Sequence, residues 1–362
     1  MREPMINSGD PPSLSMPQTP QLDGLRAIAI AIVFFGHSGF GGGGLGVTVF
    51  FFLSGYLITS LLRAEVAQRG SIDLPAFYLR RTLRIMPPLY ISLLLVFVVW
   101  NLGWLSHPVD PWAIPAQVLF VQNYAGLWGH SEGLPLTGLW SLAVEEHFYL
   151  VFPLLYLTVL GRMTPTRAAT WCLTTCVAVL GLRIVNVLVL DDYSVNYQWT
   201  HTRIDSILFG SCLALWNNPI LDKAPWQPRW WHAAVALGLM AFTFVYRDPV
   251  FRETIRYSLQ GLALFVLFSY ALQDKGLVSW GLSSWAARRI GLYSYTLYLI
   301  HNPLFKLADQ YLEVHGLART LLVLVAALAY SAAMYALVER PAGNLRRRLH
   351  EHKLKAVPAV SG

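Results

Sequence analysis

The sequence has few charged residues. Only 13% of its 362 residues are Asp, Glu, Lys or Arg, whereas an ordinary soluble domain carries about 25%. Hydrophobic residues make up 55% of the chain, and its mean hydropathy is +0.46. The charge deficit excludes a soluble enzyme of this length, and a disordered chain would instead be poor in apolar residues. The composition therefore predicts an all-α polytopic membrane protein whose partner is the lipid bilayer.

Cysteine is also scarce. Cys172, Cys176 and Cys212 all lie in apolar stretches, and an odd number without paired spacing excludes a disulfide framework. The sequence contains no CxxC pair, and no two histidines have the spacing of metal ligands. His147 beside Glu146 is only a weak metal pattern. We therefore expect no metal site.

Ten apolar segments approach the length of about 20 residues that crosses the hydrocarbon of a bilayer. They cover residues 23–40, 44–62, 86–105, 139–160, 168–190, 203–217, 230–246, 255–272, 290–308 and 317–338. An eleventh segment, 113–125, is interrupted by Pro115 and contains Gln117. We expect this segment to be re-entrant or interfacial, because polar backbone breaks are not tolerated against lipid.

The basic residues indicate the orientation of these spans. With the N-terminus in the cytoplasm, Lys and Arg fall in the inner loops and the tail, whereas the outer loops 41–43, 106–138, 191–202 and 309–316 contain none. Only the outer loop 247–254 departs from this rule. The positive-inside rule thus favours ten spans with both termini cytoplasmic. The formal net charge of +7 is then explained by topology, and we expect no nucleic-acid partner.

Domain boundaries follow from the same pattern. Residues 1–20 are rich in Pro, Ser and Asp without an apolar run, which predicts a disordered cytoplasmic leader rather than a signal peptide. Residues 21–341 form the predicted transmembrane domain, and 342–362 a basic cytoplasmic tail along the anionic inner leaflet. We expect no appended soluble domain.

Ionisable residues inside apolar segments are costly and are therefore candidate functional residues. Arg26 and His37 share a face of the first span, about 16 Å apart along the helix. Glu145 and its neighbour Glu146 lie in the fourth span, and His301 lies in the ninth at a depth similar to that of His37. A histidine base with a carboxylate beside it is a common catalytic pairing.

Structural alternatives exist for each of these residues. Arg26 could reach the interface by snorkelling, and His37 could join two helices through a hydrogen bond. The acidic pair could form an ion pair with Arg183 or Arg203. For Arg203 and Asp205 at the start of the sixth span, a structural role is favoured.

Three arginines, Arg80, Arg81 and Arg84, occur within five residues before the third span. Their spacing lets them converge on one helix face, and Pro87 and Pro88 are expected to end or bend that segment. Arginine is suited to bidentate capture of phosphate. With Arg26, they predict a cytoplasmic site for a multiply phosphorylated ligand, although positive-inside anchoring is the simpler alternative for the three.

Seven motifs in order make the chain from Leu22 to about Pro341 resemble acyltransferase family 3, a family of integral-membrane O-acyltransferases. The motifs are LDGLRAIAIAIVFFGHSG, GVTVFFFLSGYLIT, FYLRRTLRIMPPLY, LWSLAVEEHFYLVFP, RIDSILFG, GLYSYTLYLIHNPLF and LVERP. The resemblance covers the transmembrane domain 21–341. His147 departs from it, since glutamine is usual at that position.

The resemblance implies transfer of an acyl group from cytoplasmic acyl-CoA, acetyl-CoA in the first place, to a hydroxyl of a carbohydrate or glycosylated small-molecule acceptor. His37 matches the histidine regarded as essential, Arg26 its motif partner and Glu145 the motif glutamate. The expected location is the bacterial plasma (inner) membrane, as a multi-pass protein. The fused extracytoplasmic hydrolase-like domain of some members is not expected here.

The expected mechanism places the nucleotide of acyl-CoA against Arg26, Arg80, Arg81 and Arg84. His37, oriented by Glu145, then removes the proton of the acceptor hydroxyl as it attacks the thioester. His301 is the third predicted catalytic residue.

Two features of this mechanism stay open. An acyl-histidine intermediate is the alternative route, and the oxyanion could be stabilised by the glycine-rich backbone after His37 or by the hydroxyl of Tyr56 or Tyr298. The competing function is a proton-coupled exporter of a glycolipid or small acid, because intramembrane His and Glu also suit transport.

Overall fold

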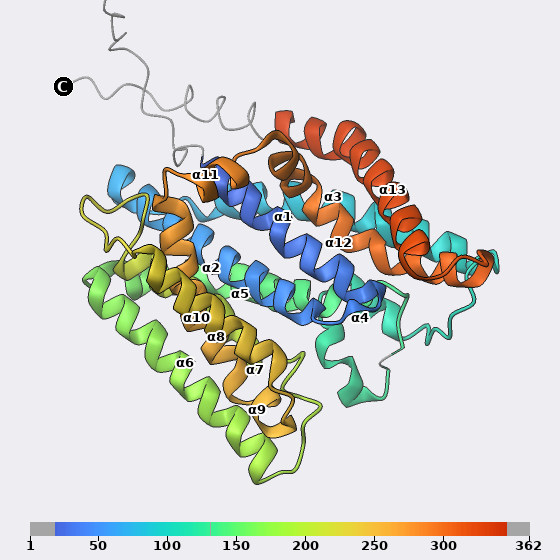
Figure 1. Ribbon diagram of the computed structural model, residues 1–362, viewed down its shortest axis with the longest axis horizontal. Helices are drawn as coiled ribbons and strands as arrows, with labels where there is room; N and C mark the ends of the chain where they lie inside the picture. Colours follow the sequence, from blue (N-terminus) through green and yellow to red (C-terminus); the bar gives the residue numbers. More distant parts are fainter. Residues whose placement is uncertain (1–18, 131, 346–362) are drawn as a thin grey trace, which may run out of the picture.

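The computed structural model describes residues 19–130 and 132–345, and these residues form helices and loops without any strand (Figure 1). The elements in chain order are α1 (Pro20–Phe35), η1 (Gly36–Phe40), α2 (Gly43–Arg69), α3 (Leu74–Asn101), α4 (Ala113–Val118), η2 (Gln122–Trp128), α5 (Leu139–Thr158), η3 (Leu160–Arg162), α6 (Pro165–Leu188), α7 (Thr200–Trp216), α8 (Trp230–Val245), α9 (Pro249–Glu253), α10 (Ile255–Gln273), α11 (Leu277–Leu282), α12 (Trp285–Tyr311), α13 (Gly316–Met334) and η4 (Tyr335–Glu339). The leader 1–20 lies almost wholly outside the described residues, as does the tail beyond 345. The all-α class is confirmed for the described part.

Seven helical segments of the described chain are long and apolar enough to cross a membrane. They begin at Pro20, Gly43, Leu74, Leu139, Pro165, Ile255 and Gly316. Helices also occupy the other three predicted ranges, as α7, α8 and α12, but α7 and α8 are short and α12 carries charges near both ends. The count of ten spans and the cytoplasmic termini therefore remain predictions. The segment 113–125 forms only α4 and part of η2, each too short to span.

The arginine segment is helical, as its spacing predicted, and it continues into the third span without a break. Asp73 caps α3 by accepting a hydrogen bond from the amide of Ala76, and the helix then runs through Pro87 and Pro88 to Asn101. Of the two expected effects of the prolines, an end of the helix is excluded, because the apolar residues beyond them continue the same helix. Pro303 likewise lies inside the continuous α12.

Close backbone contacts hold the centre of the bundle together. A Cβ added to Gly55 of α2 would lie 1.8 Å from the carbonyl oxygen of Ile207, and one added to Gly210 of α7 would lie 1.9 Å from that of Phe52. Small residues of this kind let helices approach closely where no water drives their association. α2 and α7 therefore form a tight central pair, and α1 packs along α12 beside it (Figure 1).

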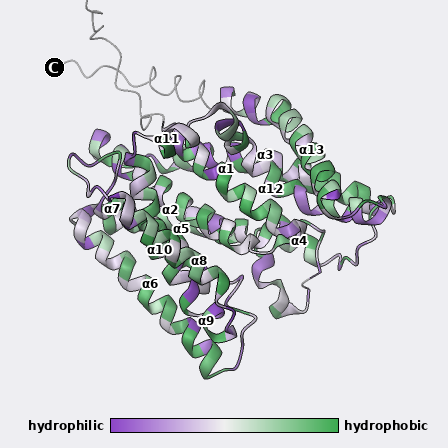
Figure 2. Ribbon diagram, viewed as in Figure 1, coloured by the Kyte–Doolittle hydropathy of each residue, from purple (hydrophilic) through white to green (hydrophobic). Residues whose placement is uncertain are grey.

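Apolar side chains cover the outer faces of the bundle. Figure 2 shows hydrophobic residues along α6 and α13 at opposite edges of the molecule. Exposed examples are Leu173 and Val177 of α6 and Leu322 and Val325 of α13. A soluble protein rarely exposes apolar faces of this extent, so these faces are suited to lipid.

Candidate active site

One cavity lies between α1, α2, α3, α5 and α12 and encloses, with its mouth, about 830 Å³. Its charged and polar lining consists of Arg26, Ser54, Arg81, Arg84, Ser141, Glu145, Glu146, Tyr149, Ser294, Tyr295 and Tyr298. The structure therefore brings together three of the four predicted phosphate ligands and the predicted glutamate. Residues from five helices meet here although they are far apart in sequence.

The arginines of this cavity make few close polar contacts, although Glu145 and Glu146 line the same space. Arg26 pairs with Asp23 on its own helix, with 2.6 Å between Nη1 and Oδ1. The Arg81 guanidinium lies over the Tyr149 ring, 5.4 Å from its centroid. Within the described chain, neither Arg81 nor Arg84 forms an ion pair or a hydrogen bond, and Arg84 is exposed. Two free guanidinium groups facing one space favour a polyanionic ligand.

Arg80 does not join this cavity. Its Nη2 lies 3.4 Å from Oε2 of Glu65, and the other carboxylate oxygen of Glu65 accepts a hydrogen bond from the amide of Asp73. Successive helical residues point about 100° apart, so Arg80 and Arg81 cannot both face the cavity. The expectation that all four arginines converge is therefore corrected for Arg80, which ties α3 to α2.

Glu145 lies in the cavity but does not orient His37. Ser54 donates a hydrogen bond of 2.8 Å to Oε1 of Glu145, and the Tyr149 hydroxyl lies 2.9 Å from the Ser54 hydroxyl and 3.5 Å from Oε2. The only hydrogen bond of His37 in the described part is to the carbonyl of Val33. The expected contact between Glu145 and His37 is not made, because the carboxylate belongs to a network on α2 and α5.

His37 instead lies beside His301. Their ring centroids are 4.9 Å apart, at an interplanar angle of 66°. Nδ1 of His37 is 2.9 Å from the carbonyl oxygen of Val33, and Nδ1 of His301 is 2.7 Å from that of Tyr298. Because a carbonyl only accepts, each Nδ1 carries a proton when these bonds form, which leaves each Nε2 with a lone pair. His301 is fully buried, and its Nε2 has no hydrogen-bond partner.

The glycine-rich turn after His37 makes this imidazole accessible. η1 continues α1 as a π-helical turn, and Gly39, Gly41 and Gly42 all have positive φ, a backbone region that glycine tolerates without strain. A Cβ on Gly36 would lie 2.3 Å from the amide nitrogen of Gly43. The chain can therefore reverse tightly into α2 and leave the ring of His37 exposed.

Tyr298 connects the histidine pair to the cavity. Its side chain lines the cavity, and its carbonyl oxygen accepts the hydrogen bond from His301. Its hydroxyl lies 2.6 Å from that of Ser141 and donates to the carbonyl of Gly138 over 3.1 Å. The second expected hydroxyl, that of Tyr56, instead donates to Asn218 away from the cavity. Of the two candidates, Tyr298 alone adjoins the histidines.

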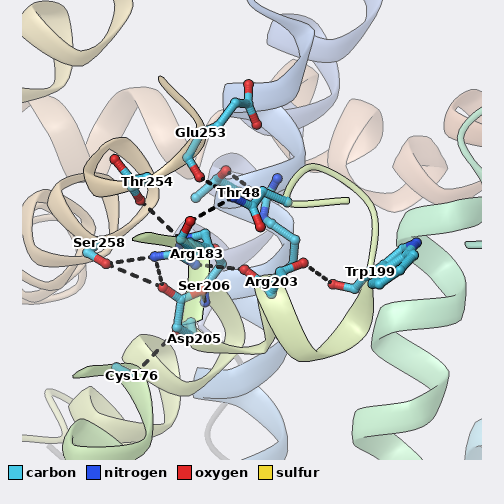
Figure 3. A network of polar contacts seen from close by, with 12 residues as sticks. Thr48, Cys176, Arg183, Trp199, Arg203, Asp205, Ser206, Glu253, Thr254 and Ser258 are labelled. Carbon is cyan, nitrogen blue, oxygen red and sulfur yellow. Dashed lines mark hydrogen bonds and ion pairs between the residues drawn. The ribbon is translucent and has the colours of Figure 1, made fainter. Parts of the chain in front are cut away.

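Arg183 of α6 and Asp205 of α7 form a buried ion pair (Figure 3). Nη2 of Arg183 is 2.7 Å from Oδ2 of Asp205, and both residues are fully buried. Arg203 lies over the Tyr257 ring at 3.9 Å and donates to the Thr48 hydroxyl. Neither arginine pairs with Glu145 or Glu146, so the alternative of an ion pair with the acidic pair does not hold. A structural role fits this network.

Sequence reasoning missed three hydroxyl groups of the site. Ser54 and Tyr149 hold Glu145, and Ser141 holds Tyr298. Tyr149 follows Glu145 by four residues, a spacing that places two side chains on one helix face and could have revealed the contact. Among the described residues, no group of three or more His, Cys, Asp or Glu side chains is arranged to hold a metal ion.

Comparison with known proteins identifies the family. The sequence profile described as "Acyltransferase domain" matches residues 19–337, which is most of the chain and includes every residue of the cavity. The chain belongs to this acyltransferase family. No solved structure matches the chain.

Curated relatives of this chain carry related names. It is 32% identical to "O-acetyltransferase OatA" of Staphylococcus aureus (strain NCTC 8325 / PS 47), over 81% of this chain and 51% of that protein. It is 29% identical to "Peptidoglycan O-acetyltransferase OatA" of Listeria monocytogenes, over 89% and 55%, respectively. For "Putative peptidoglycan O-acetyltransferase YrhL" of Bacillus subtilis (strain 168), the identity is 28%, over 93% and 57%. The chain therefore spans just over half the length of these proteins. Its apolar helices and its family make it a multi-pass membrane protein.

Proposed function

We propose that the protein is a membrane O-acyltransferase that moves an acyl group, most simply acetyl, from acyl-CoA to a hydroxyl of a cell-envelope carbohydrate. The observation that carries the proposal is the cavity with two unpaired arginines that adjoins, through Tyr298, the pair of His37 and His301. The names of the curated relatives support both the reaction class and the carbohydrate acceptor.

Acyl-CoA fits the cationic end of the cavity. Its nucleotide carries several phosphate groups, and Arg81 and Arg84 offer guanidinium groups that have no carboxylate partner in the described chain. Arg26 adds a third positive charge from α1. The slender pantetheine arm would extend along the cavity toward Tyr298 and bring the thioester to the histidines. With the orientation predicted by the positive-inside rule, the nucleotide enters from the cytoplasm.

The histidine pair supplies the proton transfer. Nε2 of His37 takes the proton of the acceptor hydroxyl as the hydroxyl oxygen forms a bond to the thioester carbon. The carbon–sulfur bond then breaks, and the departing sulfur receives that proton, so the products are an O-acyl ester and free CoA. In the alternative route, Nε2 of His37 first accepts the acyl group and then passes it to the hydroxyl.

The neighbouring groups have supporting roles. His301 lies against His37, and its Nε2 has no hydrogen-bond partner. This Nε2 is a second atom beside His37 that can accept a proton during the reaction. The Tyr298 hydroxyl, or the amides of the glycine-rich turn, would stabilise the oxyanion. Glu145, held by Ser54 and Tyr149, shapes the cavity between the arginines and Tyr298. The proposed location is the bacterial plasma (inner) membrane, with the acceptor on its outer side.

The test is transfer by purified protein in detergent, without any gradient. Acetyl-CoA is supplied with a soluble chitooligosaccharide, and O-acetylated product and free CoA are measured by mass spectrometry. His37→Ala should lower the rate by about 100-fold to 10,000-fold, the usual contribution of a general base. His315→Ala changes an exposed histidine outside the site and is the matched control.

Thermal unfolding in detergent shows that each variant is folded. A folded His37→Ala variant that transfers acetyl at the wild-type rate would contradict the proposal. Activity that appears only with a proton gradient across vesicles would instead indicate the exporter.

A further inference from the structure

A second cavity lies between α5, α6 and α7 and encloses, with its mouth, about 1000 Å³. Its walls are mainly apolar: Val151 and Leu155 come from α5, Trp171 and Thr175 from α6, and Ile204 and Leu208 from α7. It is distinct from the arginine cavity, because α5 lies between the two and presents a different face to each.

This second cavity opens toward lipid. α5 and α6 are both long and apolar enough to cross a membrane, and α6 packs on α7 rather than along α5, which leaves the space between α5 and α6 unfilled. Val151 and Trp171 at its walls are 58% and 59% exposed. In a bilayer the substance beside such an opening is hydrocarbon, so the cavity suits an apolar chain.

One end of the cavity is polar. Its lining includes His147 and Thr200, and Nδ1 of His147 lies 2.7 Å from the Thr200 hydroxyl. The side-chain nitrogen Nδ2 of Asn123 donates a hydrogen bond of 2.9 Å to the same hydroxyl. The residue that departs from the family pattern, His147, therefore belongs to this cavity and not to the arginine cavity.

An aromatic cluster adjoins this polar end. The Tyr124 ring lies parallel to that of His201 within 13°, with centroids 5.9 Å apart, and its hydroxyl is 3.0 Å from Nδ1 of His201. Trp199 contacts both rings, with centroids 5.6 and 5.2 Å away. We call Tyr124, Trp199 and His201 the aromatic cluster. Flat rings beside hydrogen-bonding groups suit the apolar face of a sugar ring and its hydroxyls.

The same segment holds unused hydrogen-bonding capacity. Both side-chain amide atoms of Gln122 and Oδ1 of Asn123 are buried without a hydrogen-bond partner. A buried unsatisfied polar atom is costly and calls for an explanation. A hydroxyl group can both donate and accept a hydrogen bond. After a small shift of η2, a ligand with several hydroxyl groups would therefore form hydrogen bonds with these side-chain atoms.

The aromatic cluster lies at the same end of the bundle as His37. Tyr197, two residues before Trp199, has its hydroxyl 3.1 Å from where a Cβ on Gly44 would lie. A Cβ on the preceding residue, Gly43, would lie 3.2 Å from the His37 ring. The chain segment that carries the cluster thus lies close to the start of α2, which in turn lies against the His37 ring.

We propose that the second cavity binds the hydrocarbon chain of a membrane amphiphile whose carbohydrate head group rests on the aromatic cluster. This inference rests on the proposed function, since the head group is the acceptor that receives the acyl group. The acceptor would enter sideways from the membrane between α5 and α6, while the donor occupies the arginine cavity.

The experiment uses two photoreactive probes with the purified protein in lipid nanodiscs. One is a diazirine-tagged geranylgeranyl glycoside of N-acetylglucosamine, and the other is the matching alcohol without sugar. Mass spectrometry locates the labelled peptides. The glycoside should label α5, α6 and α7 more strongly than the alcohol, and untagged glycoside should compete with it.

Variants distinguish the cavity from the lipid-exposed surface. Thr175→Trp fills the cavity from α6, and Val151→Trp fills it from α5; each should lower glycoside labelling by about tenfold, equivalent to about 1.4 kcal/mol of binding. Leu173→Trp adds the same side chain to α6 outside the cavity and should leave labelling unchanged. Tyr124→Ala should reduce labelling by the glycoside but not by the alcohol.

The outcomes separate this inference from the proposed function. His37→Ala should lose acyl transfer yet keep glycoside labelling. Equal labelling by glycoside and alcohol, or full labelling of both cavity-filling variants, would overturn the inference and show that the cavity holds ordinary lipid. Acyl transfer to the soluble acceptor would then still stand on its own.

Discussion

The contact between two imidazole rings is the central feature at the scale of single residues. His37 comes from η1, directly after α1, and His301 from α12. Nδ1 of each ring lies against a backbone carbonyl three or four residues earlier in the chain. This arrangement holds both rings in one tautomer. We propose that His301 positions its neighbour through this ring contact.

His301→Ala should therefore impair turnover rather than donor binding. We expect kcat to fall by about 10-fold to 100-fold while the KM for acetyl-CoA changes little, because only the transition state uses the imidazole contact. His301→Asn retains a hydrogen-bond donor near the Tyr298 carbonyl and should recover part of the loss. Steady-state kinetics with both variants measures this. An equal rise of KM in both variants would instead indicate a role in donor binding.

The buried ion pair predicts a stability effect at the same scale. Asp205→Asn leaves the Arg183 guanidinium without its carboxylate at a fully buried position. Breaking a buried pair typically costs about 3–5 kcal/mol. Thermal or denaturant unfolding in detergent checks this, with Asp309→Asn at the more exposed Arg319 pair as the control, where about 0–1 kcal/mol is expected. Similar effects of both variants would contradict the assignment.

The sequence indicated which ionisable residues lie inside the helical bundle better than it indicated their partners. The motifs identified Arg26, His37, Glu145 and His301, because ionisable groups in apolar spans are conspicuous. Contacts such as that of Glu145 with Ser54 depend on how far each helix is rotated about its axis. That rotation is set by packing against several neighbours, so a single sequence pattern does not reveal it.

At the scale of elements, α3 shows how one helix serves two purposes. Arg81 and Arg84 are three residues apart and face the cavity, whereas Arg80 faces Glu65 of α2. Helical spacing predicted that all three arginines converge on one face. Successive helical residues point about 100° apart, so only Arg81 and Arg84 face the cavity.

The division of α3 yields a paired prediction. Arg84→Ala should raise the KM for acetyl-CoA by about 10-fold, equivalent to about 1.4 kcal/mol, with little effect on kcat, because it removes binding shared by ground and transition states. Arg80→Ala should leave this KM near the wild-type value. Initial rates measured at a series of acetyl-CoA concentrations give kcat and KM for both variants. A larger rise in KM for Arg80→Ala would reverse the assignment of the two faces.

At the scale of the whole molecule, orientation across the membrane is the main prediction. In a cysteine-free background, Gly126→Cys should react with a membrane-impermeant maleimide in intact cells stripped of their outer layers. Gln68→Cys should react only in inside-out vesicles. Both positions are exposed in the structure, so burial does not limit either reaction. The reverse pattern would refute the orientation that the positive-inside rule predicts.

The contact of α2 with α7 determines where the molecule can open. Because the backbones touch at Gly55 and Gly210, no side chain between them can rotate aside, and separating the two helices would break the central packing outright. Any movement of helices that admits or releases a substrate must therefore leave the contact between α2 and α7 intact. α5 packs more loosely than α2 or α7 against its neighbours, so we expect substrates to enter and leave beside α5. The turn that carries His37, just before α2, is expected to stay in place during this motion.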